Sequence, residues 1–208
     1  MIADVPAERP VLATELSFAG RVWDLRTDTV DLGESGVVTR NYVHHTGAVA
    51  VMALNDRDEL FLVRQYRHPV RTETWEPPAG LLDLADEDPR DAAARELFEE
   101  ADLTAARWDV LIDMYASPGG SSEGIRIYLA RDIAEVPEAK RFARSEEERD
   151  MEGRWVPLDE VLASIWAGSI CGPTLLAGAM AVDAARRSHG ATLRPADAAW
   201  RRPPSPLD

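Results

Sequence analysis

The sequence predicts an α/β sandwich, in which helices lie on both sides of a mixed β-sheet. Short apolar segments of strand length recur along the chain, and two or three longer segments with helical periodicity lie among them. This order is typical of layered α/β folds. Hydrophobic residues make up 45% of the 208 positions, which is enough to form a core. The length corresponds to one main domain with room for a small appendage.

Strands and turns follow from local composition. The first fifteen residues predict a lead-in without regular structure, and the polar residues 55–58 predict the connection of a hairpin. Segments rich in β-branched or alternating apolar residues predict strands at 22–30, 37–43, 48–54, 60–65, 110–115, 124–130 and 154–156.

Helices are expected just before residue 102 and over residues 159–167 and 174–187. The last nineteen residues are rich in proline and arginine and predict an extended or disordered tail. The predicted organisation is an N-terminal β-rich segment, a main domain and a tail, at residues 1–45, 46–189 and 190–208.

The first of these helices carries the most informative pattern in the chain. Asp88 suits an N-cap and Pro89 suits the first helical position. At ~100° per residue, Glu96, Glu99 and Glu100 fall within an arc of about 100°. Like charges at this spacing repel each other, and clustered carboxylate oxygens suit the hard cations Mg²⁺ or Mn²⁺. Glu96 and Glu100 lie one turn apart and are the main candidate metal ligands. The alternative is a solvated acidic face with an Arg95–Glu99 ion pair.

The spacing of charges around this helix resembles a known family motif. The order is Gly80, six residues, Glu87, seven residues, Arg95-Glu96-Leu97, one residue, Glu99-Glu100, one residue and Asp102-Leu103. It resembles the box of the Nudix family, whose members hydrolyse nucleoside diphosphates linked to another moiety. The gap after the glycine is one residue longer than usual, and Asp102 replaces a usual glycine. Neither departure removes a carboxylate, and Asp can adopt the left-handed conformation that a helix C-cap needs.

A second stretch indicates a subgroup. Pro118 lies fifteen residues beyond Leu103, within Ser-Pro-Gly-Gly-Ser-Ser-Glu. A proline at this distance resembles the ADP-ribose pyrophosphatases, which implies substrate contacts at Pro118, Gly119 and Ser122. The implied reaction is metal-dependent hydrolysis of ADP-ribose to AMP and ribose 5-phosphate. The alternatives are another nucleoside diphosphate sugar as substrate, or a non-catalytic ligand sensor with this fold.

The resemblance also implies individual roles. The carbonyl oxygen of Ala79 joins Glu96 and Glu100 as a metal ligand. Glu99 binds a second metal or holds water, and Arg95 and Glu87 orient the glutamates. A general base is expected from a late acidic loop, with Glu148 favoured and Glu147 as its substitute; Glu99 is the alternative.

Three residues outside the box are candidates for substrate contact. Arg67 follows a predicted strand, and its planar guanidinium suits bidentate phosphate binding. Trp75 can stack on a base, although a core position is the more common fate of an aromatic residue. Glu76 can accept a hydrogen bond from a ribose hydroxyl or an amino group.

Charge and cysteine content restrict partners and location. The net charge of −14 argues against a nucleic-acid backbone or an anionic membrane as partner. The single cysteine, Cys171, indicates a reducing compartment and is expected to be buried. The N-terminal residues lack a signal-peptide pattern, so a cytoplasmic location is expected. The resemblance implies a homodimer formed through the N-terminal segment.

Overall fold

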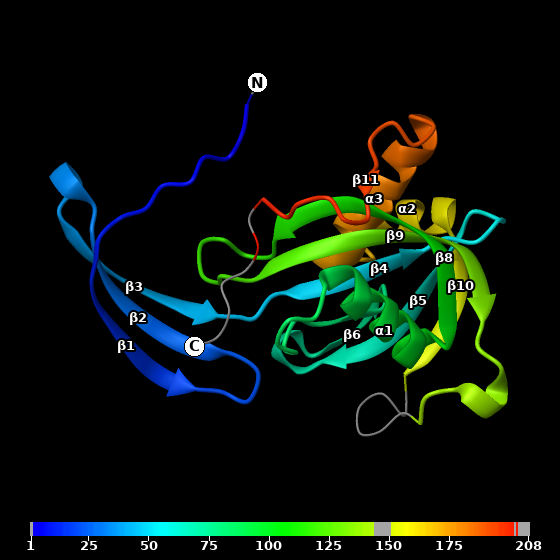
Figure 1. The fold of residues 1–208 in the computed structure, drawn as a ribbon, viewed down its shortest axis with the longest axis horizontal. Helices are drawn as coiled ribbons and strands as arrows, with labels where there is room; N and C mark the ends of the chain where they lie inside the picture. The colour runs from blue at the N-terminus through cyan, green and yellow to red at the C-terminus, as the bar shows by residue number, and fades with distance from the viewer. Residues whose placement is uncertain (1, 144–150, 202, 204–208) are drawn as a thin grey trace. The chain divides into compact units, whose positions relative to one another are not determined.

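The computed structural model describes residues 2–143, 151–201 and 203 of the 208-residue chain (Figure 1). By their contacts these residues form two compact units. The first contains the N-terminal residues up to Thr46 together with residues 117–123, and the second contains residues 47–116 and 124–203. The sequence did not indicate that residues 117–123 join the N-terminal unit.

The N-terminal unit is built on a three-stranded antiparallel sheet in the order β1-β2-β3. Its strands are β1 (Val11–Ala19), β2 (Asp24–Asp31) and β3 (Val37–His44). The residues 117–123 attach to the end of β3, where the Val43 N–H donates to the Gly120 carbonyl at 2.9 Å and the Ser122 N–H donates to the Val43 carbonyl at 3.0 Å.

The prediction of an unstructured lead-in is wrong for β1. Every residue of β1 is exposed, so the strand lacks the alternation of buried and exposed side chains that reveals strands in a sequence. The strand forms by pairing with the next strand, β2, and local composition does not show this pairing.

The second unit contains a mixed five-stranded sheet in the order β11-β8-β9-β4-β7. Only the β4–β9 pair is parallel, and the other pairs are antiparallel. The strands are β4 (Ala48–Ala53), β7 (Ala79–Leu81), β8 (Leu103–Tyr115), β9 (Gly124–Glu135) and β11 (Arg194–Pro195). An antiparallel sheet in the order β10-β5-β6 completes the unit, with strands β5 (Glu59–Arg67), β6 (Thr72–Glu76) and β10 (Glu152–Pro157).

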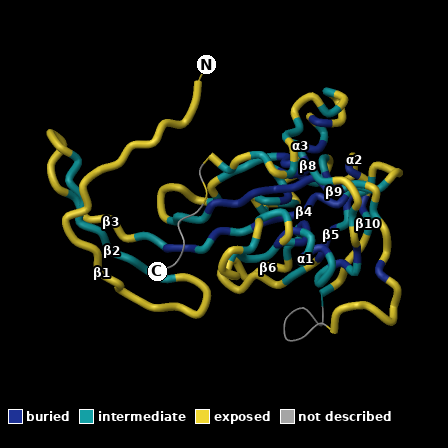
Figure 2. Tube along the Cα trace, viewed as in Figure 1, coloured by how far each residue is buried: buried dark blue, intermediate teal, exposed yellow. Residues whose placement is uncertain are grey.

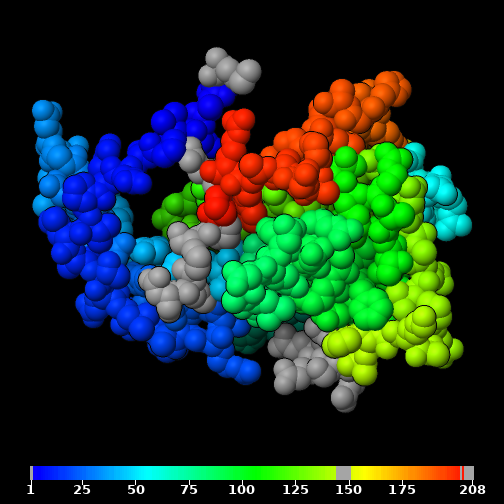
Figure 3. All heavy atoms as spheres, viewed as in Figure 1, coloured from blue at the N-terminus to red at the C-terminus, as the bar shows by residue number. Residues whose placement is uncertain are grey.

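Helices cover both faces of the mixed sheet, as the sequence predicts. Val49 and Val51 of β4 pack in one core cluster with Leu97 of helix α1 (Pro89–Ala101). The alternate residues Ala50 and Met52 pack in a second cluster with helices α2 (Leu158–Trp166) and α3 (Pro173–Arg187). Figure 2 shows the burial concentrated in the central strands β4 and β9, and Figure 3 shows the atoms of α1 lying against those of β8.

Three local expectations need correction. Residues 55–58 form the predicted turn, in which the Asp58 N–H donates to the Asn55 carbonyl at 3.2 Å, but the strands beside it pair at a single bridge, Leu54–Leu60, and belong to different sheets. The part of the predicted tail around Arg194 is held to the protein, since Arg194 pairs with Val110 of β8. Cys171 is exposed rather than buried. Among the described residues, no helix has the length and apolar character that a membrane crossing requires.

Candidate metal and substrate site

Helix α1 begins and ends as its sequence predicts. The Asp88 carboxylate accepts a hydrogen bond from the Arg90 N–H at 2.8 Å, and Pro89 occupies the first helical position. Asp102 forms the C-cap in the left-handed conformation, with φ of 54°. The aspartate that replaces the usual glycine therefore adopts the backbone conformation that ends the helix.

Two glutamates of α1 contact the short strand β7. The Glu100 carboxylate accepts from the Ala79 N–H at 2.9 Å. Glu96 is only 8% exposed and lies against Gly80. A β-carbon at Gly80 would lie 2.0 Å from Cδ of Glu96, so the absence of a side chain leaves the space that this carboxylate fills. The structure thus brings Ala79, Glu96 and Glu100 together, as the sequence predicts.

Arg95 is surrounded by carboxylates. Its guanidinium donates to both oxygens of Glu87 at 3.0 Å, to Oε1 of Glu96, and to Oε2 of Glu99 at 3.3 Å. The hydrogen bonds to Glu87 are the main reason that the pKa of Arg95 lies above its ordinary value. The arginine therefore stays charged and holds three carboxylates in place, which suits the orienting role expected of it.

The arrangement fits a divalent cation whose coordination is completed by other ligands. Within residues 2–143, 151–201 and 203, no three His, Cys, Asp or Glu side chains are gathered into a ready metal cage. Mg²⁺ does not need one, because it usually keeps several waters and binds one or two carboxylates together with substrate phosphates. The buried Glu96 carboxylate, the Glu100 carboxylate and the Ala79 carbonyl are hard oxygen donors of the type that such ions prefer. Glu99 is held by Arg95 beside them.

A second set of charged residues lies on β5 and β6. The Arg67 guanidinium donates two hydrogen bonds to the Glu76 carboxylate, from Nε to Oε1 at 2.9 Å and from Nη2 to Oε2. The Thr74 hydroxyl also donates to Oε1. Burial alone would raise the pKa of Glu76, but the hydrogen bonds from Arg67 and Thr74 outweigh it and lower this pKa. Strand alternation places Arg67 on the face of β5 that carries Phe61, which packs against the α1 side of the core.

Trp75 points away from this face. It packs against the core cluster that contains α2 and α3. The guanidinium carbon of Arg154 lies 4.5 Å from its ring centroid, and that of Arg64 lies at 5.7 Å. This environment favours the core position that the sequence left open, and a stacking role for Trp75 on the substrate stays a prediction.

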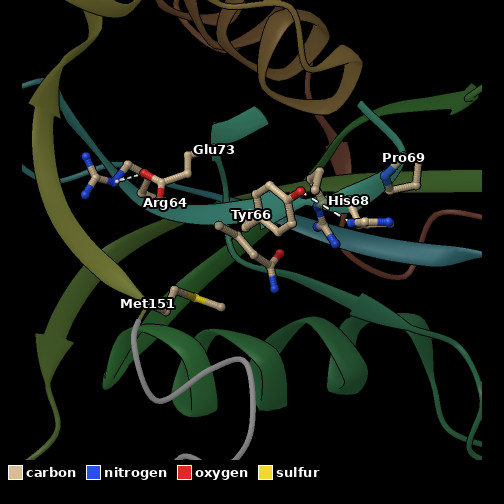
Figure 4. A pocket seen from close by; sticks show the side chains of 8 residues that line it. Arg64, Tyr66, His68, Pro69, Glu73 and Met151 are labelled. Atoms are coloured by element: carbon tan, nitrogen blue, oxygen red, sulfur yellow. Dashed lines mark hydrogen bonds and ion pairs between the residues drawn. The ribbon is translucent and has the colours of Figure 1, made fainter. Parts of the chain in front are cut away.

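A cavity of about 590 Å³ opens beside β5. Figure 4 shows Tyr66 in its middle, with the Tyr66 hydroxyl 3.3 Å from Nδ1 of His68. The cavity is lined by Arg64, Gln65, Tyr66, Arg67, His68, Pro69, Glu73 and Met151. Sequence reasoning missed His68 and Met151 as lining residues. Consecutive residues 64–69 line the cavity, so strand alternation gives no signal for this cluster, and Met151 directly precedes β10, which pairs with β5.

Pro118, Gly119 and Ser122 belong to the N-terminal unit. The Ser122 hydroxyl accepts from the His45 N–H at 2.9 Å and lies 3.4 Å from Nδ1 of His44. Their contact with a substrate stays a prediction. Glu147 and Glu148 lie outside the described residues.

Known proteins resemble this chain in sequence and in fold. The NUDIX domain matches residues 44–171. The chain is 41% identical over 191 residues to an ADP-ribose pyrophosphatase of Mycobacterium tuberculosis, covering 91% of this chain and 89% of that protein. It is 34% identical over 139 residues to an ADP-ribose pyrophosphatase of Bacillus subtilis, covering 67% and 75%. The crystal structure of an ADP compounds hydrolase shares the fold, with a TM-score of 0.71 at 20% identity over 90% of this chain and 99% of that one.

Proposed function

This chain belongs to the Nudix family, and from that premise we propose that it hydrolyses the pyrophosphate bond of ADP-ribose to AMP and ribose 5-phosphate. The observation that carries the proposal is the meeting of Glu96 and Glu100 with the Ala79–Gly80 backbone. Together these groups are rich in oxygen atoms and suit a divalent cation. They lie on α1 and β7, within the residues that match the family. The identity of 41% to an ADP-ribose pyrophosphatase over most of the chain supports the choice of substrate.

The residues present would hold Mg²⁺, and Mn²⁺ is an alternative with the same preference for oxygen. Glu96, Glu100 and the Ala79 carbonyl are the proposed ligands, with Glu99 for a second ion. When bound, the metal offsets phosphate charge and lowers the pKa of a coordinated water. Arg95 holds the carboxylates of Glu87, Glu96 and Glu99 in place through its hydrogen bonds.

The other residues bind the substrate and move a proton. Arg67 presents a planar guanidinium to the pyrophosphate, in a chain whose net charge of −14 otherwise repels an anion. A water oxygen attacks one phosphorus, and the bond from that phosphorus to the bridging oxygen breaks. A glutamate takes the proton of the water: Glu148 is favoured, with Glu147 or Glu99 as the alternatives. Gly119 and Ser122, beside Pro118, are proposed to approach the substrate through a loop that admits close backbone contact.

We propose that the protein acts as a cytoplasmic homodimer. Leu16 and Phe18 of β1 are 56% and 59% exposed, and β1 forms an edge of its sheet. Exposed apolar residues on an unpaired edge strand favour association with a second copy. A strongly acidic chain does not favour nucleic acid or an anionic membrane as a partner. The single cysteine agrees with a reducing compartment.

A substrate panel tests the proposal. ADP-ribose, GDP-mannose and NADH are each incubated with the protein and Mg²⁺, and phosphate is measured after a phosphatase has been added to release it from the products. Rapid release from ADP-ribose with AMP as product is expected. A preference for GDP-mannose would identify another nucleoside diphosphate sugar as the substrate. No hydrolysis of any compound, with binding retained, would favour a ligand sensor.

A further inference from the structure

We infer that Glu76 is a positioning residue that fixes the guanidinium of Arg67 for the substrate pyrophosphate and ties it to the segment that carries the metal site. This inference rests on the proposed function, and it replaces the expectation that Glu76 binds a ribose hydroxyl. It concerns how the substrate-binding arginine is held before the substrate arrives.

The first step is the geometry of the pair. Nε and Nη2 of Arg67 donate to the two different oxygens of Glu76, which is the bidentate arrangement that fixes the plane of a guanidinium. The side chain of Glu76 is only 18% exposed, whereas that of Arg67 is 47% exposed. The carboxylate is thus the fixed partner, and the arginine is the partner that solvent and a ligand can reach.

The second step concerns the hydrogen bonds that the Glu76 carboxylate already accepts. Oε1 of Glu76 already accepts from Nε of Arg67 and from the Thr74 hydroxyl. A carboxylate oxygen has two lone pairs, so Oε1 is fully used, and Oε2, which accepts from Nη2 of Arg67, keeps a single remaining site. The direction of the Glu76 pKa agrees, because hydrogen bonds that stabilise the charged form lower it despite burial.

The third step is the connection to the metal site. Glu76 is followed by the buried residues Pro77 and Pro78, and the Pro78 carbonyl accepts from the Val51 N–H at 2.8 Å. The next residue is Ala79, whose N–H is bound by Glu100. Proline fixes its own φ and restricts the residue before it, so the path from Glu76 to Ala79 is stiff. The carboxylate that holds Arg67 is therefore rigidly joined to the backbone beside the proposed metal ligands.

A double-mutant cycle tests this role. Glu76→Gln removes the charge but keeps the shape, and Arg67→Ala removes the group that Glu76 is inferred to hold. Kinetic constants for ADP-ribose are measured at saturating Mg²⁺ for the wild type, both single variants and the double variant. Glu76→Gln is expected to raise KM by about 10-fold or more, the size set by loss of a hydrogen bond to a charged group, with kcat changed much less. In the Arg67→Ala background, Glu76→Gln is expected to cause no further loss.

The chain offers a matched control. Glu59 lies on β5 and its side chain is 21% exposed. It accepts from Nε of Arg57 at 3.0 Å and from the Asn55 amide at 2.7 Å, so it resembles Glu76 in chemistry but lies at the far end of the strand. Glu59→Gln is expected to leave kcat and KM unchanged. If Glu76→Gln does not fold, Thr74→Val serves instead, because it removes one hydrogen bond to Glu76 and is expected to raise KM by ~3-fold.

The outcomes separate this inference from the proposed function. A wild-type protein that does not hydrolyse ADP-ribose contradicts the proposed function and with it the inference. A wild-type protein that does, with Glu76→Gln kinetically normal, overturns the inference alone. Losses that simply add in the double variant would also overturn it, because they would assign Glu76 its own contact with the substrate.

Discussion

The substitution Gly80→Ala tests whether close packing sets the position of Glu96, a proposed metal ligand. An ideal β-carbon at residue 80 lies 2.0 Å from Cδ and 2.1 Å from Oε1 of Glu96, whereas ordinary van der Waals contacts of a β-carbon lie beyond about 3.4 Å. Because this overlap involves the carboxylate itself, the Glu96 side chain must move by an ångström or more. It is almost buried and bound by Arg95, so the movement breaks that hydrogen bond.

The expected cost follows from these contacts. Displacement of a carboxylate from the metal site removes several kcal/mol of charge stabilisation, and each ~1.4 kcal/mol is tenfold in rate. We therefore expect kcat/KM for ADP-ribose to fall by ~10²-fold, with a higher Mg²⁺ concentration needed for half-maximal rate. Insertion of a methyl group into a packed site should also lower the free energy of unfolding by ~1–3 kcal/mol.

Steady-state kinetics over a Mg²⁺ titration and thermal unfolding measure the two effects. Gly172→Ala is the matched control, because a β-carbon there meets nothing closer than the Trp75 carbonyl oxygen at 4.0 Å. Gly172 is the N-cap of α3, so the control should lose about 1 kcal/mol of stability at most and keep its turnover. Wild-type turnover and Mg²⁺ dependence in Gly80→Ala would refute the reasoning, as would wild-type turnover in Glu96→Gln.

Four further predictions use other parts of the molecule. Glu148→Gln should slow hydrolysis by ~10²–10⁴-fold with little change in substrate affinity; if Glu99→Gln is the damaging variant instead, the base lies on α1. The folded state lowers the pKa of Glu76. The stability that its charged form contributes is therefore present above the ordinary glutamate pKa of ~4.3 and is lost as the pH falls below that value. Glu76→Gln should thus make the stability of the protein less dependent on pH in the acid range. Trp200→Ala should lower the melting temperature with kcat unchanged, because it removes a ring whose centroid lies 4.8 Å from the guanidinium carbon of the buried Arg126. This cation–π contact is worth about 1–2 kcal/mol. Deletion of residues 1–45 should abolish dimerisation, as checked by light scattering at micromolar concentration, and should also abolish ADP-ribose binding; a fully active monomer would contradict the expectation that the N-terminal segment serves both.

Local signals in the sequence were sufficient for helix α1. Its N-cap, its N-terminal proline and its left-handed C-cap are each decided within a few residues, so Asp88, Pro89 and Asp102 are found where the sequence predicts them. Strand alternation was sufficient for the central strands, because their two faces pack against different helices. It failed for β1, which buries neither face, and for the supposed hairpin, because the choice of partner for β4 and β5 is made by distant strands.

The site shows the same division between local and long-range information. Helical spacing indicated that Glu96, Glu99 and Glu100 share a face. It could not show that Glu96 fills the space above Gly80, since this contact depends on how α1 packs against β7. Nor could it show that Arg67 and Glu76 bind each other, because their nine-residue separation is bridged by the pairing of β5 with β6. The resemblance supplied the role of the Ala79 backbone, which carries no side-chain signal of its own.

Two arginines near the proposed site are each hydrogen-bonded to carboxylates. The Arg95 guanidinium is shared among Glu87, Glu96 and Glu99, and the Arg67 guanidinium is held by Glu76. One positive charge among several carboxylates leaves the face of α1 negative, so this face alone repels a pyrophosphate. A bound divalent cation is the largest local charge in such a site and inverts its field. Arg95 therefore sets the geometry of this face, and the charge that draws a pyrophosphate to α1 has to arrive with the metal, while Arg67 is proposed to bind the pyrophosphate from β5.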